Sequence, residues 1–101
     1  MLKIKGYKPV DIDKTLAERG TRYGDPQTHA LTAQDLQRAM TTAPGWVRLA
    51  DDQRRALQVI ADNIARILNG DPNYADYWYD IIGCTTLVER RLADDSKKIT
   101  P

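Results

Sequence analysis

Three aspartates and one arginine are the residues of this sequence whose type and spacing could do chemistry. Asp76 and Asp80 are four residues apart, so on a helix both carboxylates would lie on the same side. A like-charge pair at that spacing costs roughly 0.2–0.5 kcal/mol unless a positive charge offsets it. Arg66 could supply that charge, and Asp62, four residues before it, could share it. The group suits a bound cation, an ion pair between helices, or a solvated surface.

A second group lies nearer the N-terminus, in residues 18–26, ERGTRYGDP. Arg19 and Arg22 carry planar donors suited to phosphate, and Tyr23 has a ring on which a base could stack. The two glycines permit positive φ and close backbone approach. Turn formation explains the glycines and the proline, but it does not require two arginines and a tyrosine.

The first ten residues alternate lysine with apolar side chains, which predicts an extended arm or a short strand. A lysine-rich edge that resists aggregation is one explanation. The alternative is an arm that lies over a neighbouring subunit or brings Lys5 and Lys8 to a phosphate.

Helices must position these groups. Apolar residues recur at helical spacing through 54–68 and again through 78–92, and Gly70, Asp71 and Pro72 separate the two stripes. The glycine predicts a helix end, and Asp-Pro predicts an N-cap with proline in the next first turn. Two helices joined so closely should pack antiparallel as a hairpin.

Shorter helices are expected over residues 11–19 and 28–41, the second with the sole histidine, His29, in a structural role. The predicted fold is therefore all-α: a small bundle of about four helices with a C-terminal antiparallel helical hairpin. We expect an extended basic arm over 1–10, a helical domain over 11–93 and a frayed tail over 94–101.

Composition excludes several classes of protein. The chain has 101 residues, a formal net charge of +1 and one cysteine, Cys84. It therefore has no global field to attract nucleic acid, no internal disulfide and no cysteine-based zinc cluster. It has no apolar run of about 20 residues. We expect no secretory signal, because the first residues alternate lysine with apolar side chains and form no uninterrupted apolar stretch. These features predict a cytoplasmic protein with no membrane or nucleic-acid-polymer partner.

Residues 18–26, 64–72 (IARILNGDP) and 76–83 (DYWYDIIG) resemble a family of small phage and prophage proteins. That family has Arg-x-Tyr-Gly-Asp-Pro, then Lys-Ile-Ala-Arg-Ile, then Asp-Ser-x-x-Asp-Ile-x-Gly-Tyr, in this order. The family is in turn distantly similar to the MazG-like all-α nucleotide pyrophosphohydrolases. Those enzymes are helical bundles, often dimers or tetramers, that hold Mg²⁺ with acidic residues of two helices.

The chain departs from the enzyme pattern where the metal would bind. The pyrophosphohydrolases carry Glu-x-x-Glu on one helix and Glu-x-x-Asp on the other. Here the first helix offers only Asp62, and Asp76 and Asp80 are spaced by four rather than three. Because Mg²⁺ catalysis needs enough carboxylates to fix the ion and activate water, this departure favours binding without turnover.

The resulting prediction is a phage-encoded, homo-oligomeric binder that sequesters a nucleotide-type ligand in the infected host cell, such as an anti-phage defence signal, with no cofactor. We expect the ligand at a subunit interface, on arginine, lysine and aromatic side chains. The candidate ligand-binding residues are Arg19, Arg22, Tyr23, Arg66, Tyr74, Trp78, Lys5 and Lys8.

Two alternatives remain open. One is a Mg²⁺-dependent nucleotide pyrophosphohydrolase, whose metal ligands would be Asp62, Asp76 and Asp80. The other is a structural or protein-interaction module, in which the acids and arginines only join helices. In that last case Arg66→Ala would lower the melting temperature, and no small molecule would raise it.

Overall fold

The computed structural model describes residues 12–99, with the side chains of residues 19–23 and 99 outside the description. The described part of the chain forms four α-helices and one short 3-10 helix, without a strand, so the predicted all-α class is confirmed. The elements are α1 (Ile12–Tyr23), α2 (Pro26–Thr41), η1 (Pro44–Arg48), α3 (Asp51–Asn69) and α4 (Ala75–Ile99).

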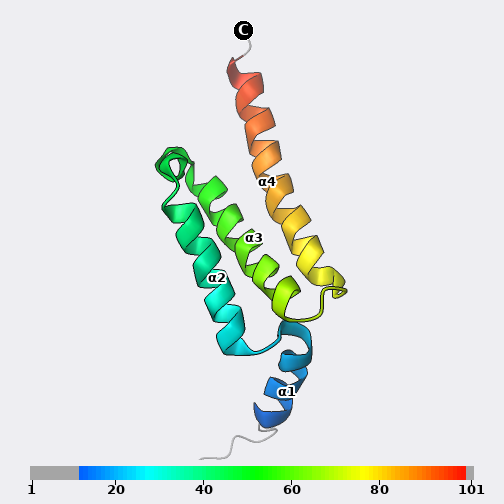
Figure 1. The fold of residues 1–101 in the computed structure, drawn as a ribbon. Helices are drawn as coiled ribbons and strands as arrows, with labels where there is room; N and C mark the ends of the chain where they lie inside the picture. The colour runs from blue at the N-terminus through cyan, green and yellow to red at the C-terminus, as the bar shows by residue number, and fades with distance from the viewer. Residues whose placement is uncertain (1–11, 100–101) are drawn as a thin grey trace, which may run out of the picture.

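Helix α3 is the centre of the fold. It packs against α4 on one side and α2 on the other, while α1 crosses beside the end of α3 (Figure 1). Helices α3 and α4 run antiparallel and diverge toward the C-terminus, as expected of a helical hairpin. At the end where they diverge, Arg91 of α4 connects the two helices, because its guanidinium donates to both carboxylate oxygens of Asp52 on α3 at 2.9 and 2.8 Å.

Local sequence explains where α2 and α3 begin. The Asp25 carboxylate accepts from the backbone N–H of Thr28 at 3.0 Å and from its hydroxyl at 2.9 Å, which caps α2 ahead of Pro26. These hydrogen bonds hold the pKa of Asp25 below its usual value. Ahead of α3, the side chain of Gln53 accepts from the backbone N–H of Ala50 at 2.9 Å.

Some helix ends differ from the sequence-based expectations. Helix α1 continues through Gly20 to Tyr23 rather than ending at residue 19. Helix α4 begins at Ala75, because Asp71 accepts from the backbone N–H of Asn73 and forms a turn that leaves Pro72 outside the helix. Helix α4 also extends through residues 94–99, where a frayed tail was expected. The basic arm, residues 1–10, lies outside the described residues.

Gly24 joins α1 and α2 to the end of α3. Its φ is +77°, in the left-handed region that favours glycine, and an added Cβ would lie 1.8 Å from the backbone oxygen of Asn69. The side chain of Asn69 donates to the Thr32 hydroxyl at 3.0 Å and to the Ala65 carbonyl at 2.8 Å. The predicted close approach at this glycine is therefore present, and it fixes the α1–α2 corner beside the C-terminal turn of α3.

The described core is small and consists mainly of alanines. The buried apolar residues are Ala33, Ala56, Ala61, Ala65 and Tyr77. Helices α2, α3 and α4 thus form one layer around a thin core. Among the described helices, none combines the length and apolarity needed to cross a membrane.

Candidate functional site around Arg66

Arg66 lies on the α3 face that is open between α2 and α4. Its guanidinium is 3.2 Å from one carboxylate oxygen of Asp62, one helical turn earlier. The other oxygen of Asp62 is 3.1 Å from Nε2 of His29 on α2. Asp62 therefore connects α2 to the arginine, and the Asp62–Arg66 pair that their four-residue spacing suggested is present.

A polar groove of about 580 Å³ surrounds this pair. Two arginines and two aspartates line it, so its formal charges cancel, and the remaining polar side chains are amides from α2 and α3. The lining residues are Gln34, Gln37, Arg55, Gln58, Val59, Asp62, Asn63, Arg66 and Asp80. The volume lies within the range of about 300–1,000 Å³ that is usual for small-molecule sites.

A smaller aromatic pocket of about 240 Å³ adjoins the polar groove, because Arg66 and Asp80 line both. Tyr74 and Tyr77 pack edge to face there, with ring centroids 5.0 Å apart. Tyr77 is buried and anchors the start of α4, whereas Tyr79 is exposed. The pocket is lined by Arg66, Tyr74, Asp76, Tyr77, Tyr79 and Asp80. One site thus offers guanidinium, amide and aromatic groups together.

Asn63 is the buried polar residue of the groove, with 2% of its surface exposed. Its Nδ2 donates to the Val59 carbonyl at 3.0 Å, and among the described residues its Oδ1 has no hydrogen-bond partner. The reverse orientation of the amide would set two oxygens against each other, so the unpaired atom is the acceptor. A buried acceptor without a partner costs roughly 1–3 kcal/mol.

The structure brings together five of the residues predicted from sequence, Asp62, Arg66, Tyr74, Asp76 and Asp80, which line the two adjoining pockets. Trp78 lines neither of them. It is half exposed, and its indole N–H donates to the Pro72 carbonyl at 2.9 Å, on another side of α4.

The remaining predicted residues are less defined. Arg19, Arg22 and Tyr23 belong to α1, near the end of α3 that carries Arg66, but their side chains lie outside the description, as do Lys5 and Lys8 altogether.

The three candidate metal ligands do not share one pocket. Asp62 and Asp80 line the polar groove, and Asp76 and Asp80 line the aromatic pocket. Across the described residues, no three acidic, histidine or cysteine side chains are grouped so that they could hold an ion. As a set of protein ligands for Mg²⁺, these aspartates therefore do not fit.

Sequence reasoning missed the amide-rich wall of the groove. Gln34 and Gln37 belong to α2, and Gln58 and Asn63 belong to α3, so these side chains meet only once the two helices pack. His29, which was expected to be structural, joins α2 to α3 through its contact with Asp62. Its position three residues after the Pro26 helix start gave no signal of that contact.

No protein-family model matches the chain, and neither a curated protein nor a solved structure matches it. The resemblance to phage proteins and to MazG-like pyrophosphohydrolases therefore remains a prediction from the sequence motifs.

Proposed function

We propose that the chain binds a nucleotide-type small molecule, without turning it over, in the groove around Arg66. The observation that carries the proposal is the junction of the two pockets at this residue, where a polar groove of about 580 Å³ meets an aromatic pocket of about 240 Å³. In this arrangement Arg66 contacts a phosphate, and the more accessible tyrosines, Tyr74 and Tyr79, stack on a base. The amides of α2 and α3 bind hydroxyl and amide groups of the ligand.

The charges around the groove limit how much negative charge a ligand can carry. Arg55 and Arg66 balance Asp62 and Asp80, and Asp76 in the adjoining pocket adds one more negative charge. A bare triphosphate would therefore meet a surface with no net positive charge to balance it. The groove suits ligands with few charges and many hydrogen-bonding groups, such as cyclic nucleotides and ADP-ribose-type molecules.

The biological part of the proposal rests on the phage-like motifs. A phage protein that binds a nucleotide signal and does not destroy it acts by sequestration, as a sponge, and it must therefore be abundant and release its ligand slowly. The target we propose is a signalling nucleotide of a host anti-phage defence system.

Calorimetry with a panel of cyclic and ADP-ribose-type nucleotides tests the proposal. We expect one panel member to bind and be recovered intact, and Arg66→Ala to weaken its binding at least tenfold, or about 1.4 kcal/mol. The matched control is Arg38→Ala, because Arg38 is an exposed arginine that pairs with Asp35 within α2 and lines neither pocket. If no panel member binds, or if both variants bind as the wild type does, the proposal is wrong.

The enzyme alternative has one observation in its favour, because Asp62, Asp76 and Asp80 all line the connected pockets. It requires ligands for Mg²⁺ in addition to these three side chains. Incubation of nucleoside triphosphates with the protein and Mg²⁺ or Mn²⁺ tests it: pyrophosphate release that Asp80→Asn abolishes would favour the enzyme, and intact nucleotides would exclude it.

A further inference from the structure

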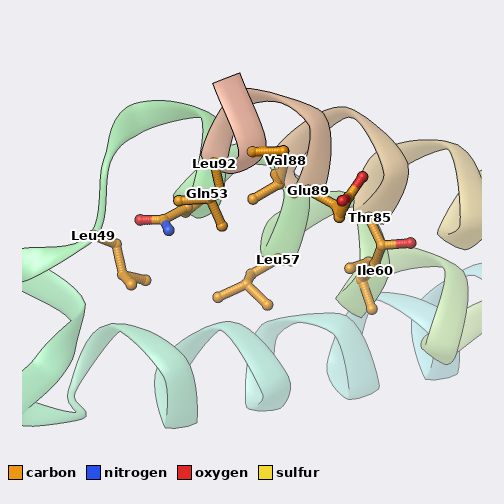
Figure 2. Close-up of a pocket in the computed structure, with 10 residues that line it drawn as sticks. Leu49, Gln53, Leu57, Ile60, Thr85, Val88, Glu89 and Leu92 are labelled. Carbon is orange, nitrogen blue, oxygen red and sulfur yellow. The ribbon is translucent and has the colours of Figure 1, made fainter. Parts of the chain in front are cut away.

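The pockets of the molecule differ in the part of a nucleotide that they suit. An apolar groove between α3 and α4 is lined by Leu57 and Ile60 of α3 and by Val88 and Leu92 of α4 (Figure 2). It has no aromatic ring and no arginine, and it shares no residue with the polar groove or the aromatic pocket. Of these pockets, only the aromatic one therefore offers rings on which the base of a nucleotide could stack.

The charges of the two adjoining pockets orient a nucleotide. The formal charges of the polar groove cancel, whereas in the aromatic pocket one arginine, Arg66, stands against two aspartates, Asp76 and Asp80, which leaves a net negative charge. A phosphate is repelled by such a pocket, and an uncharged base with N–H donors is not. The phosphate therefore belongs in the polar groove, and the base belongs in the aromatic pocket beside Tyr74 and Tyr79.

Asp76 is the aspartate that lines the aromatic pocket alone, because Asp80 lines the polar groove as well. The two residues are one helical turn apart on α4, or roughly 6 Å along the axis. Among the described residues, the exposed carboxylate of Asp76 has no hydrogen bond or ion pair that would give it a structural role. An ionised carboxylate only accepts hydrogen bonds, so both of its oxygens can accept from N–H groups of a base.

Guanine is the base whose hydrogen-bonding groups match a carboxylate. Its Watson–Crick edge presents two adjacent donors, N1–H and the N2 amino group, and one carboxylate can accept from both. Adenine and cytosine have a ring acceptor beside the amino donor, and uracil has one donor between two carbonyl groups. In these three bases an acceptor would face the negative carboxylate with no proton between them, which is unfavourable.

We infer that the ligand carries guanine and that Asp76 is the residue that determines this specificity. The inference rests on the proposed function and narrows it: guanine-containing cyclic nucleotides bind more tightly than ADP-ribose-type molecules, whose base is adenine. Asp80 lies where the two pockets meet, so it accepts from a ribose hydroxyl between the base and the phosphate. That hydroxyl is common to the nucleotides compared, and Asp80 therefore does not distinguish their bases.

Calorimetry with matched nucleotides tests the inference on the full chain. The probes are the 3′,5′-cyclic monophosphates of guanosine, adenosine, cytidine and uridine, together with cyclic di-GMP, cyclic di-AMP and ADP-ribose. Within the monophosphates and within the dinucleotides, only the base differs. We expect the guanine member to bind about tenfold more tightly than the other members of its kind. Cyclic inosine monophosphate, which lacks the N2 amino group, should bind with an affinity between those of the guanine and adenine monophosphates.

Asp76→Asn should exchange the preference between two bases. An asparagine side chain both donates and accepts, so it can pair with N1 and the N6 amino group of adenine. This variant should bind the adenine member more tightly than the guanine member. Asp80→Asn should change the affinities for all bases by one common factor. Asp94→Asn is the matched control, because Asp94 is exposed on the same helix and lines neither pocket, and it should leave every affinity unchanged.

Failure of this inference differs from failure of the proposed function. If the bases bind with equal affinity, or if an adenine nucleotide such as ADP-ribose binds most tightly, the chain binds nucleotides and the guanine inference is wrong. An Asp76→Asn variant that unfolds at the wild-type temperature and keeps the wild-type order of affinities would also overturn it. If no nucleotide binds, the proposed function and the guanine inference are both wrong.

Discussion

Nε2 of His29 lies 3.1 Å from Oδ1 of Asp62, which joins two helices through residues that are 33 positions apart in sequence. The contact orients the carboxylate so that its second oxygen faces Arg66 at 3.2 Å. Because a guanidinium has five N–H donors, Arg66 can keep this aspartate and still bind a phosphate. Asp62 thus positions the arginine and, at the same time, competes with any anion for it.

That competition gives the first prediction. Asp62→Asn should tighten binding of an anionic nucleotide roughly fivefold, or by about 1 kcal/mol, because one negative charge leaves the groove. The stability cost should be about 1 kcal/mol or less, since the pair is partly exposed. Calorimetry and thermal unfolding measure the two effects. A metal-dependent enzyme would respond in the opposite direction, with weaker binding and lost turnover.

Asp35→Asn is the control for this substitution. It removes an aspartate that pairs with Arg38 on the exposed face of α2, and it lines neither pocket. The affinity should stay at the wild-type value. Equal tightening in both variants would show that the effect comes from net charge and not from the groove.

The second prediction concerns Asn63. Asn63→Leu should raise the melting temperature by a few degrees, because it replaces a buried unpaired acceptor with an apolar group of similar size. The same substitution should weaken binding of the nucleotide, since it removes the amide from the groove. A variant that is destabilised would indicate that Oδ1 has a partner, such as bound water.

The third prediction concerns Gly24. Gly24→Ala requires a left-handed backbone, at about 1–2 kcal/mol, and forces its methyl group against the Asn69 oxygen. We expect the melting temperature to fall by roughly 10 °C or more. Gly83→Ala is the matched control: nothing lies within 4 Å of the added Cβ and the residue is within α4, so this variant should be slightly stabilised.

The fourth prediction concerns pH. Hydrogen bonds from Arg91 hold the pKa of Asp52 below its usual value of 3.8. The folded protein therefore favours the ionised carboxylate, and the stability that the pair provides is present above that value and is lost as the pH falls through the lower, folded pKa. Thermal unfolding of Asp52→Asn should show a lower melting temperature at pH 7 and a smaller decrease on acidification.

Asp94→Asn serves as the control for the pH experiment, because Asp94 is exposed on the same helix as Arg91. Its melting temperature should follow the wild-type pH dependence. In 1 M salt the difference between wild type and Asp52→Asn should narrow, since the ion pair is half exposed and salt screens it. Identical acid dependence in all three proteins would contradict the role of the Arg91 pair.

Local patterns predicted the helices, the antiparallel hairpin and the Asp62–Arg66 pair, because each depends on residues that are close in sequence. The spacing of Asp76 and Asp80 also placed them in one pocket. The patterns could not predict that amide side chains of α2 and α3 line the polar groove, since Gln37 and Gln58 come together only after α2 packs on α3. They also could not show that Trp78 lies outside both pockets, because stacking potential does not reveal that its N–H donates to the Pro72 carbonyl.

The central position of α3 has a mechanical consequence. Helices α2 and α4 contact α3 far more than they contact each other. The two outer helices are therefore connected mainly through α3. A ligand that contacts both Gln34 of α2 and Asp80 of α4 would connect these two helices directly. Ligand binding would then restrict the motion of α2 relative to α4. The angle between these two helices would depend on the bound ligand.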